Sequence, residues 1–371
     1  MKFIFIFILV IFLLANFYVF QRIWVLIPPS KIGYGILIAF AILVNISLFI
    51  FFIFGNQLSM GIASFFYTVG TSWIFIFLYL FILTLIKDLI RLTRLVPSDL
   101  FTHYTRENWV GLCFAIVFVF LLMFCGYLKY RWKVKVELPV SVEKVMEKRD
   151  SLRIVAISDL HLGYSIGVPE LQEWIEFINA EEPDIVLIAG DIIDNSIRPL
   201  KEQNMAQYFK HIKAPLGVYA CVGNHEYISG YKESAEFMNA AGIRLLQDEV
   251  ALVDSSFYVI GRDDRMNPDR KPISELVAGI DRSKPIILLD HQPYHLEEAE
   301  ANKIDLQISG HTHKGQVWPI SLITNMLYEK SHGYLKKGDT NIYVSSGIGI
   351  WGGKFRIGTQ SEYVVINMKQ E

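Results

Sequence analysis

The stretch RIVAISDLHLG (residues 153–163) joins a short apolar run to the polar triplet Asp159-Leu160-His161. An apolar run of this length that ends in a polar turn is typical of a buried strand in a layered α/β domain. Four more runs share the pattern, at residues 184–189, 217–222, 285–289 and 304–309. Because ligands bind at the carboxyl ends of the strands in open α/β sheets, we expect the polar residues after these runs to meet.

A short motif rich in Asp, Asn or His follows each of the five runs. In chain order the motifs are Asp159-Leu160-His161, Gly190-Asp191, Gly223-Asn224-His225-Glu226, Asp290-His291 and Gly310-His311-Thr312-His313. Taken alone, each motif is weak, since a lone Asp-x-His arises by chance and a lone Gly-Asp is usually a turn. Five motifs in five equivalent positions predict one site assembled from distant segments.

The chemistry of these side chains favours a metal site. If carboxylates and imidazoles met at one edge without a cation, no interaction would offset the free energy needed to desolvate them. Imidazole and carboxylate ligands suit Zn, Fe and Mn, whereas the lack of Cys in the motifs argues against a structural zinc site with thiolate ligands.

The segments between the motifs predict the rest of an α/β domain. Amphipathic helices are expected over residues 169–180 and 232–241, and further strands over residues 257–261, 341–346 and 362–367. Several later strands follow one another with no helix between them, so we expect a mixed sheet.

The first third of the chain has a different character, with four apolar runs at residues 3–20, 33–54, 62–86 and 109–128. Each run is close to the ~20 residues that cross a bilayer as a helix. Buried helices of a soluble protein would show a polar face, and a cleaved signal peptide would show a small-x-small site. No run contains Asp, Glu, Lys or Arg, which favours an anchor over a transporter.

The charge distribution separates the same two parts. The first 128 residues hold seven of the 35 Lys and Arg and three of the 37 Asp and Glu, so the remainder has a net charge near −6. This acidic remainder argues against a nucleic-acid partner bound through a basic surface. We therefore predict a membrane anchor with its juxtamembrane linker at residues 1–135 and a globular domain at residues 136–371. The boundary falls in residues 130–150, a charged stretch that we interpret as a link between the last apolar run and the first core strand.

The order of the five motifs resembles that of the calcineurin-like metallophosphoesterases. The longer strings SDLHLG (158–163), GHTHKGQ (310–316) and SGIGIW (346–351) look like those of the bacterial membrane-associated, YkuE/YaeI-like phosphoesterases. The resemblance covers about residues 153–367 and implies a layered α/β fold, a β-sandwich flanked by helices, behind a four-helix transmembrane segment.

The resemblance also implies two divalent metal ions, with Mn, Fe or Zn left open. It assigns Asp159, His161, Asp191 and His313 to the first metal, and Asp191, Asn224, His291 and His311 to the second. Asp191 would bridge the two metals, and the catalytic residues would be His225, Asn224 and Asp191. His225 would reach the substrate as a proton donor or phosphate contact. Glu226 stands where many relatives have Asp, and Asp194 is expected to be either an outer acceptor or a helix cap.

The implied activity is hydrolysis of phosphate esters by a hydroxide that bridges the two metals, since two cations lower the pKa of a shared water. The alternative reaction is cleavage of a lipid-linked or nucleotide-sugar diphosphate, as in UDP-diacylglucosamine hydrolases. A non-enzymatic scaffold is disfavoured because every ligand is retained. The expected partners are a phosphoester substrate, such as a phospholipid or a cell-envelope phosphate, and the lipid bilayer.

The expected location is the membrane of a bacterial cell. The cations flanking the four runs divide about five against six between the two sides, which leaves the orientation undecided. Relatives of the YkuE/YaeI kind tend to face outwards, so the resemblance favours a domain outside the cytoplasm.

Overall fold

The structure is a computed structural model that describes residues 2–370. The chain divides into two compact units, Met1–Tyr127 and Leu128–Glu371. The predicted division into an anchor at residues 1–135 and a domain at residues 136–371 assigns a function to each part, so it stays a prediction.

The first unit is helical. Its helices are α1 (Lys2–Leu26), α2 (Lys31–Phe54), α3 (Met60–Thr93), α4 (Ser98–Thr105) and most of α5 (Trp109–Arg131). Among the described residues, α1, α2, α3 and α5 are long and apolar enough to cross a membrane, which confirms the predicted four-helix segment. α3 continues well beyond the apolar run that ends at residue 86.

Polar side chains within this unit are paired with one another. Asp88, on the extension of α3, accepts hydrogen bonds from the hydroxyl of Tyr18 at 2.6 Å and from Nε of Arg22 at 2.9 Å. Deeper in the unit, Nε1 of Trp73 donates to Oδ1 of Asn16 at 2.9 Å. The helices are therefore joined by buried hydrogen bonds as well as by apolar contact.

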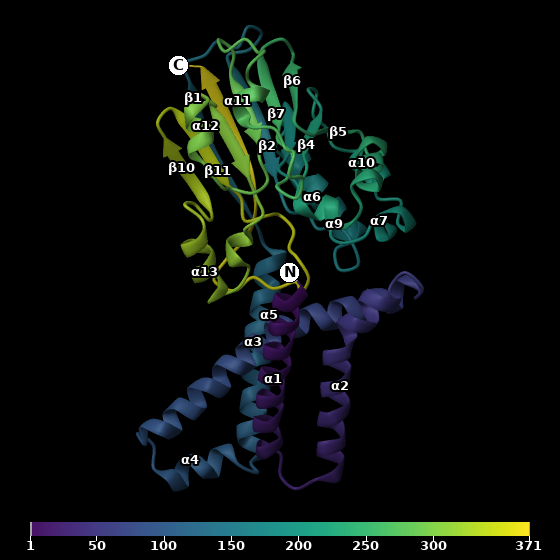
Figure 1. Cartoon of the computed structure of the whole chain (residues 1–371), viewed down its shortest axis with the longest axis vertical. Coiled ribbons are helices and arrows are strands. Elements are labelled where there is room, and N and C mark those ends of the chain that lie inside the picture. Colours follow the sequence, from purple (N-terminus) through teal and green to yellow (C-terminus); the bar gives the residue numbers. More distant parts are fainter. Residues whose placement is uncertain (1, 371) are drawn as a thin grey trace. The chain divides into compact units, whose positions relative to one another are not determined.

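The second unit is a sandwich of two six-stranded sheets (Figure 1). The first sheet has the strand order β1 (Lys133–Val142), β12 (Ser361–Gln370), β2 (Ser151–Ile157), β3 (Ile185–Ile188), β4 (Val218–Cys221) and β5 (Ile243–Leu246). The second has the order β10 (Gly333–Lys337), β11 (Thr340–Val344), β9 (Leu306–Ser309), β8 (Ile286–Leu289), β7 (Phe257–Gly261) and β6 (Glu249–Val253).

Both sheets are mixed, as expected. In the first sheet the pairs from β2 to β5 are parallel, β1 is parallel to β12, and β12 is antiparallel to β2. In the second sheet β7, β8, β9 and β11 are parallel neighbours, while β6 and β10 are antiparallel edges. The carboxyl ends of β2, β3 and β4 thus share one edge, and those of β8 and β9 share another.

Side-chain alternation divides each strand of the first sheet between two apolar cores. Ile154 and Leu187 point into the core between the sheets, where they pack with residues of β8 and β9 such as Leu289 and Ile308. Their neighbours on the same strands face outward into a second core. Because successive side chains of a strand point to opposite faces, both faces of this sheet are buried, as the uninterrupted apolar runs predict.

Helices cover the outer faces of the sandwich. α6 (Val168–Ala180) and α10 (Tyr231–Ala240) pack on the first sheet, and α11 (Ile273–Leu276) and α12 (Glu297–Ala301) pack on the second. The shorter helices are α7 (Arg198–Glu202), α8 (Ala206–Phe209), α9 (Asn224–Ile228), α13 (Ile320–Leu327) and the 3₁₀ turn η1 (His313–Gly315). The expected helices at 169–180 and 232–241 match α6 and α10 within a residue.

One expectation was wrong. Residues 130–150 were interpreted as a charged linker, yet β1 occupies half of this stretch and adds a ten-residue strand beside β12. Its charged residues alternate with apolar ones, and Leu138, Val140 and Val142 are buried. This is the period-2 pattern of an edge strand with one buried face.

We predict that truncating Leu187, which is fully buried between the sheets, to Ala destabilises the domain by about 2–5 kcal/mol, because the surrounding side chains fill the cavity only in part. Leu252 on β6 is 47% exposed and provides the matched control, for which Leu→Ala should cost less than about 0.5 kcal/mol. The melting temperatures of the two full-length variants in detergent, each compared with that of the unsubstituted protein, measure the difference. Equal shifts in melting temperature would contradict the assignment of the core.

Candidate metal centre

The predicted ligands come from the ends of five strands that belong to both sheets. β2, β3 and β4 lie in the first sheet, and β8 and β9 lie in the second. The residues that follow them are Asp159, His161, Asp191, Asn224, His225, His291, His311 and His313. The sequence pattern predicted a single sheet edge. The sandwich instead stacks two edges, so that donors from the two sheets face one another.

Five of these residues have a left-handed backbone, a conformation that is rare for residues other than glycine. Their φ angles lie between 47° and 69° at Asp159, His161, Asp191, His311 and His313. Gly190 is also left-handed, with φ 78°, and a Cβ there would lie 2.7 Å from Nδ1 of His291. Such strain persists where the surrounding structure enforces it, and it is concentrated at functional sites.

The first group of donors consists of Asp159, His161 and His313, whose ligand atoms all lie within 4.8 Å of one another. The Nε2 atoms of His161 and His313 are 3.0 Å apart, and Nε2 of His313 is 3.6 Å from Oδ1 of Asp159. Two imidazole nitrogens that face each other so closely require a proton or a cation between their lone pairs.

The second group consists of Asp191, His291 and His311, whose ligand atoms also lie within 4.8 Å of one another. Nε2 of His291 is 3.1 Å from Oδ2 of Asp191 and 3.2 Å from Oδ1 of Asn224. The same Asn224 oxygen is 2.9 Å from Nδ1 of His311. Oδ2 of Asp191 also lies 3.8 Å from Nε2 of His161, so Asp191 stands between the two groups.

These donors fit divalent cations. Nδ1 of His291 donates to the carbonyl oxygen of Ala189 at 2.7 Å, which leaves the lone pair of Nε2 directed at Asp191. Fixing one ring nitrogen in this way is how proteins orient a histidine ligand. Nδ1 of His313 is buried and has no hydrogen-bond partner. Nitrogen and oxygen donors of this mixture suit Mn, Fe or Zn.

The protonation of the histidines is consistent with this use. Burial lowers the pKa of His313 well below its usual range and that of His311 to about 3, so both rings are neutral and offer lone pairs. Burial opposes both the ionisation of Asp191 and the protonation of His291. Their mutual attraction nevertheless prevails, lowering the pKa of Asp191 and raising that of His291. A cation beside the carboxylate would take over the role of that proton.

Glu226 binds the backbone of the loop that carries Asp191. Its Oε2 accepts hydrogen bonds from the amides of Asp191 at 3.0 Å and Gly223 at 2.7 Å, and its Oε1 accepts from Ile192 at 2.8 Å and Ile193 at 3.1 Å. Burial, followed by repulsion from Asp191, raises the pKa of Glu226 to about 7. Glu226 was expected outside the ligands, but its function of joining two loops leaves no signal in the sequence.

Asp194 lies behind two histidines of the site. Its Oδ1 is 3.5 Å from Nδ1 of His161 and 3.6 Å from Nδ1 of His225, and its carbonyl oxygen accepts a short hydrogen bond from Nδ1 of His225. α7 begins at Arg198 and has Ile197 as its cap, so the alternative interpretation of Asp194 as a helix cap was wrong. Asp194 therefore holds the orientation of both rings.

Arg356 binds the backbone beside the centre, and the sequence patterns did not predict it. It is almost fully buried and donates to the carbonyl oxygens of His313 at 2.8 Å, Ser346 at 2.5 Å and Gly349 at 3.0 Å. Burial lowers its pKa to about 10, and the guanidinium remains charged at neutral pH. A single arginine in an otherwise ordinary loop gives no sequence signal of this kind.

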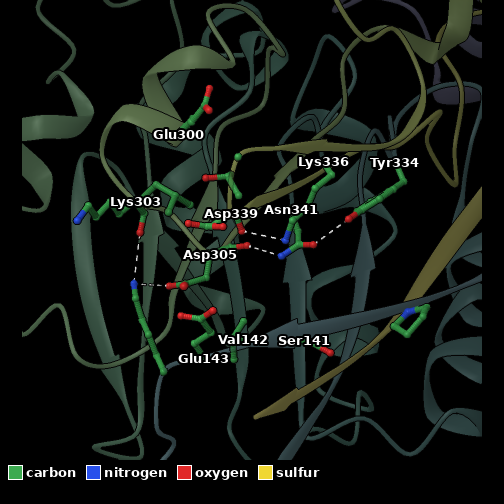
Figure 2. A pocket seen from close by; sticks show the side chains of 15 residues that line it. Ser141, Val142, Glu143, Glu300, Lys303, Asp305, Tyr334, Lys336, Asp339 and Asn341 are labelled. Carbon is green, nitrogen blue, oxygen red and sulfur yellow. Dashed lines mark hydrogen bonds and ion pairs between the residues drawn. The ribbon is translucent and has the colours of Figure 1, made fainter. Parts of the chain in front are cut away.

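A cleft of about 620 Å³ lies elsewhere on the second unit (Figure 2). None of the residues that line it is a predicted ligand. Its polar groups are bonded to one another: Nζ of Lys144 donates to Oδ2 of Asp305 at 2.6 Å, and Tyr334 donates to Oδ1 of Asn341 at 2.9 Å. These contacts explain the polar lining as structural, and the histidine cluster remains the candidate site.

The fold is a two-layer α/β sandwich, and carboxylate, amide and imidazole groups meet at its strand ends. These two features place the protein among the metal-binding α/β sandwiches. A family model described as "Calcineurin-like phosphoesterase" matches residues 152–315. The chain belongs to the calcineurin-like metallophosphoesterases, a family of phosphoester hydrolases.

Three relatives illustrate this membership. An uncharacterized metallophosphoesterase of Campylobacter jejuni is 29% identical over 98% of this chain and 97% of its own length. The metallophosphoesterase YkuE of Bacillus subtilis is 31% identical over 59% of this chain and 80% of its own length. A "transmembrane protein with metallophosphoesterase domain" of Danio rerio is 32% identical over 63% of this chain, which spans 57% of that protein. The four apolar helices and the transmembrane relative of Danio rerio together support a membrane protein.

We predict that Asp191→Ala and His225→Ala have different effects on bound metal. Asp191 lies between the two donor groups, so its loss should remove most of the metal. His225 already donates from Nδ1 to the carbonyl of Asp194, so its loss should leave most of the metal bound. Elemental analysis of the purified full-length variants, with circular dichroism as a check on folding, measures this difference.

The test is demanding because one ring nitrogen of His225 also lies within 4.8 Å of ligand atoms of His161 and Asp191. Equal metal loss in both variants would show that His225 is a ligand and would contradict the separate function assigned to it.

Proposed function

We propose that this protein is a membrane-anchored phosphoester hydrolase that works with two divalent cations held at the ends of five strands. In this proposal residues 1–135 are the anchor and residues 136–371 are the hydrolase domain. The observation that carries the proposal is the meeting of two donor groups, one around His161 and His313 and one around His291 and His311, with Asp191 between them.

The two groups correspond to the two metal positions that the family resemblance implies. Asp159, His161, Asp191 and His313 would hold one cation, and Asp191, Asn224, His291 and His311 would hold the other. When bound, such a pair supplies a hydroxide at neutral pH and neutralises the charge that develops on the phosphoryl group. The protein contributes the fixed placement of these donors.

His225 is the residue in this proposal that transfers a proton to the leaving group. Its Nδ1 is committed to the carbonyl oxygen of Asp194, which leaves Nε2 as the nitrogen that can carry a transferable proton. The ring stands edge-on to that of His161, at 4.5 Å between centroids, and is partly exposed where the ligand rings of His161 and His291 are buried. A substrate oxygen can therefore reach it.

The remaining chain residues keep this arrangement rigid. Asn224 follows Gly223 at the start of α9, where the amide of His225 donates to Oδ1 of Asp191 at 2.9 Å. The same carboxylate thus fixes the α9 turn and faces the donors of both groups. Nothing in the described part of the chain favours a nucleotide-sugar diphosphate over other phosphoesters, so the proposal covers phosphoesters as a class.

We expect the full-length protein in detergent to release nitrophenol from bis(4-nitrophenyl) phosphate only when Mn²⁺ or a similar ion is present. A chelator should abolish the reaction and added metal should restore it, because the donor groups depend on a cation to bind the phosphoryl oxygens. Asp191→Asn should reduce turnover to background.

Asp339→Asn is the matched control, because it makes the same chemical change at an exposed residue of the cleft in Figure 2. Loss of activity in the Asp339 variant, with activity kept in the Asp191 variant, would move the active site to that cleft and end the proposal.

We also expect attack at phosphorus and not at the aryl carbon, because in this proposal the donor groups hold the cations against the phosphoryl oxygens. Hydrolysis of 4-nitrophenyl phosphate in heavy-oxygen water should then place one labelled oxygen in the phosphate product, which mass spectrometry detects. Label found in nitrophenol would mean attack at carbon and would exclude this mechanism.

A further inference from the structure

Helix α13 (Ile320–Leu327) turns its apolar side chains outward and a polar side chain inward. Leu322, Ile323, Met326 and Leu327 are exposed, and Met326 is 86% exposed. Ser321, by contrast, is turned inward and only 7% exposed. A surface helix of a soluble domain normally turns its apolar face to the core. Here the apolar face points away from the domain.

The exposed side chains form one continuous surface. Residues four apart lie next to each other on a helix. Leu322 therefore lies beside Met326, and Ile323 lies beside Leu327. Trp318, just before the helix, adds a half-exposed indole, and α13 contains no charged residue. An apolar patch of this kind on a folded domain marks a surface that contacts a partner or a membrane.

This patch adjoins the metal centre at both ends of the helix. η1, which begins at the predicted ligand His313, packs directly against α13. Tyr328, which follows the helix, places its ring 6.3 Å from that of His311 and accepts a hydrogen bond from the hydroxyl of Tyr294 at 3.0 Å. Any surface that binds α13 therefore lies next to the candidate site.

The occupant that fits best is lipid. α5 is long and apolar enough to span a membrane and ends at Arg131, and only Trp132 separates it from β1 of the second unit. A link of one residue keeps the start of β1 next to the end of the helix that would span the bilayer. Trp318 is a residue type that favours the headgroup layer, and Lys314 and Lys330 flank the helix with positive charge that suits anionic lipids.

We propose that α13 and Trp318 lie in the headgroup layer of the bilayer, with Leu322, Ile323, Met326 and Leu327 inserted among the acyl chains. The lipid contact stands by itself. Its consequence, that the metal centre takes phosphoesters from the headgroup layer, rests on the proposed function.

The test uses the full chain in vesicles of phosphatidylcholine and phosphatidylglycerol, with Cys113→Ala and Cys125→Ala to remove the exposed thiols of α5. An environment-sensitive fluorophore is attached at Met326→Cys. The matched control is Leu252→Cys, also an exposed apolar residue, which pairs with Tyr258 at the start of β7 and so lies at the end of the sandwich opposite the metal centre.

We expect blue-shifted emission at position 326 and quenching by nitroxide-labelled phosphatidylcholine that is several-fold stronger than at position 252. Quenching of the 326 probe by aqueous iodide to the same extent as the 252 probe would show a solvated helix and overturn the proposal. Protection from both quenchers would show that protein covers the helix, which overturns it as well. Neither the emission shift nor the quenching depends on catalysis. The lipid contact and the proposed function can therefore be contradicted independently of each other.

Discussion

The structure depends on the placement of two carboxylates and four imidazoles in a region from which water is almost excluded. Asp159 and Asp191 are buried, as are His161, His291 and His313, and a desolvated carboxylate is stable only beside a compensating charge. The five parallel strand ends supply the geometry, and cations are the compensation that the donor atoms fit. The ring nitrogens of His161 and His313, which face each other at 3.0 Å, need a proton or a cation between them.

Such a cluster requires rigid loops, and two buried polar residues hold them. Glu226 gathers four backbone amides around the Asp191 turn, and Arg356 gathers carbonyl oxygens around His313 and the segment after β11. Glu226 accepts hydrogen bonds from backbone N–H groups, and Arg356 donates to backbone C=O groups. Each residue therefore pairs backbone groups of the left-handed turns. The centre thus rests on backbone contacts as much as on its donor side chains.

The sequence predicted the family, the mixed α/β layers and the four apolar helices, because each depends on local patterns or ordered motifs. It did not predict that the donors come from two sheets, since strand order across a sandwich is a long-range property. β1 was missed because alternating charges between residues 133 and 142 resemble a linker. Arg356 and α13 were missed for a different reason: their importance lies in what they contact or leave exposed, which only coordinates reveal.

The position of β12 has a consequence for biosynthesis. This strand lies between β1 and β2 in the first sheet, although it is translated after every other described strand. While the ribosome still holds residues 361–370, β1 has no neighbour in the sheet and one side of β2 is unpaired. β1, which is translated first of the strands, therefore joins the sheet only through β12, well after the apolar helices have emerged.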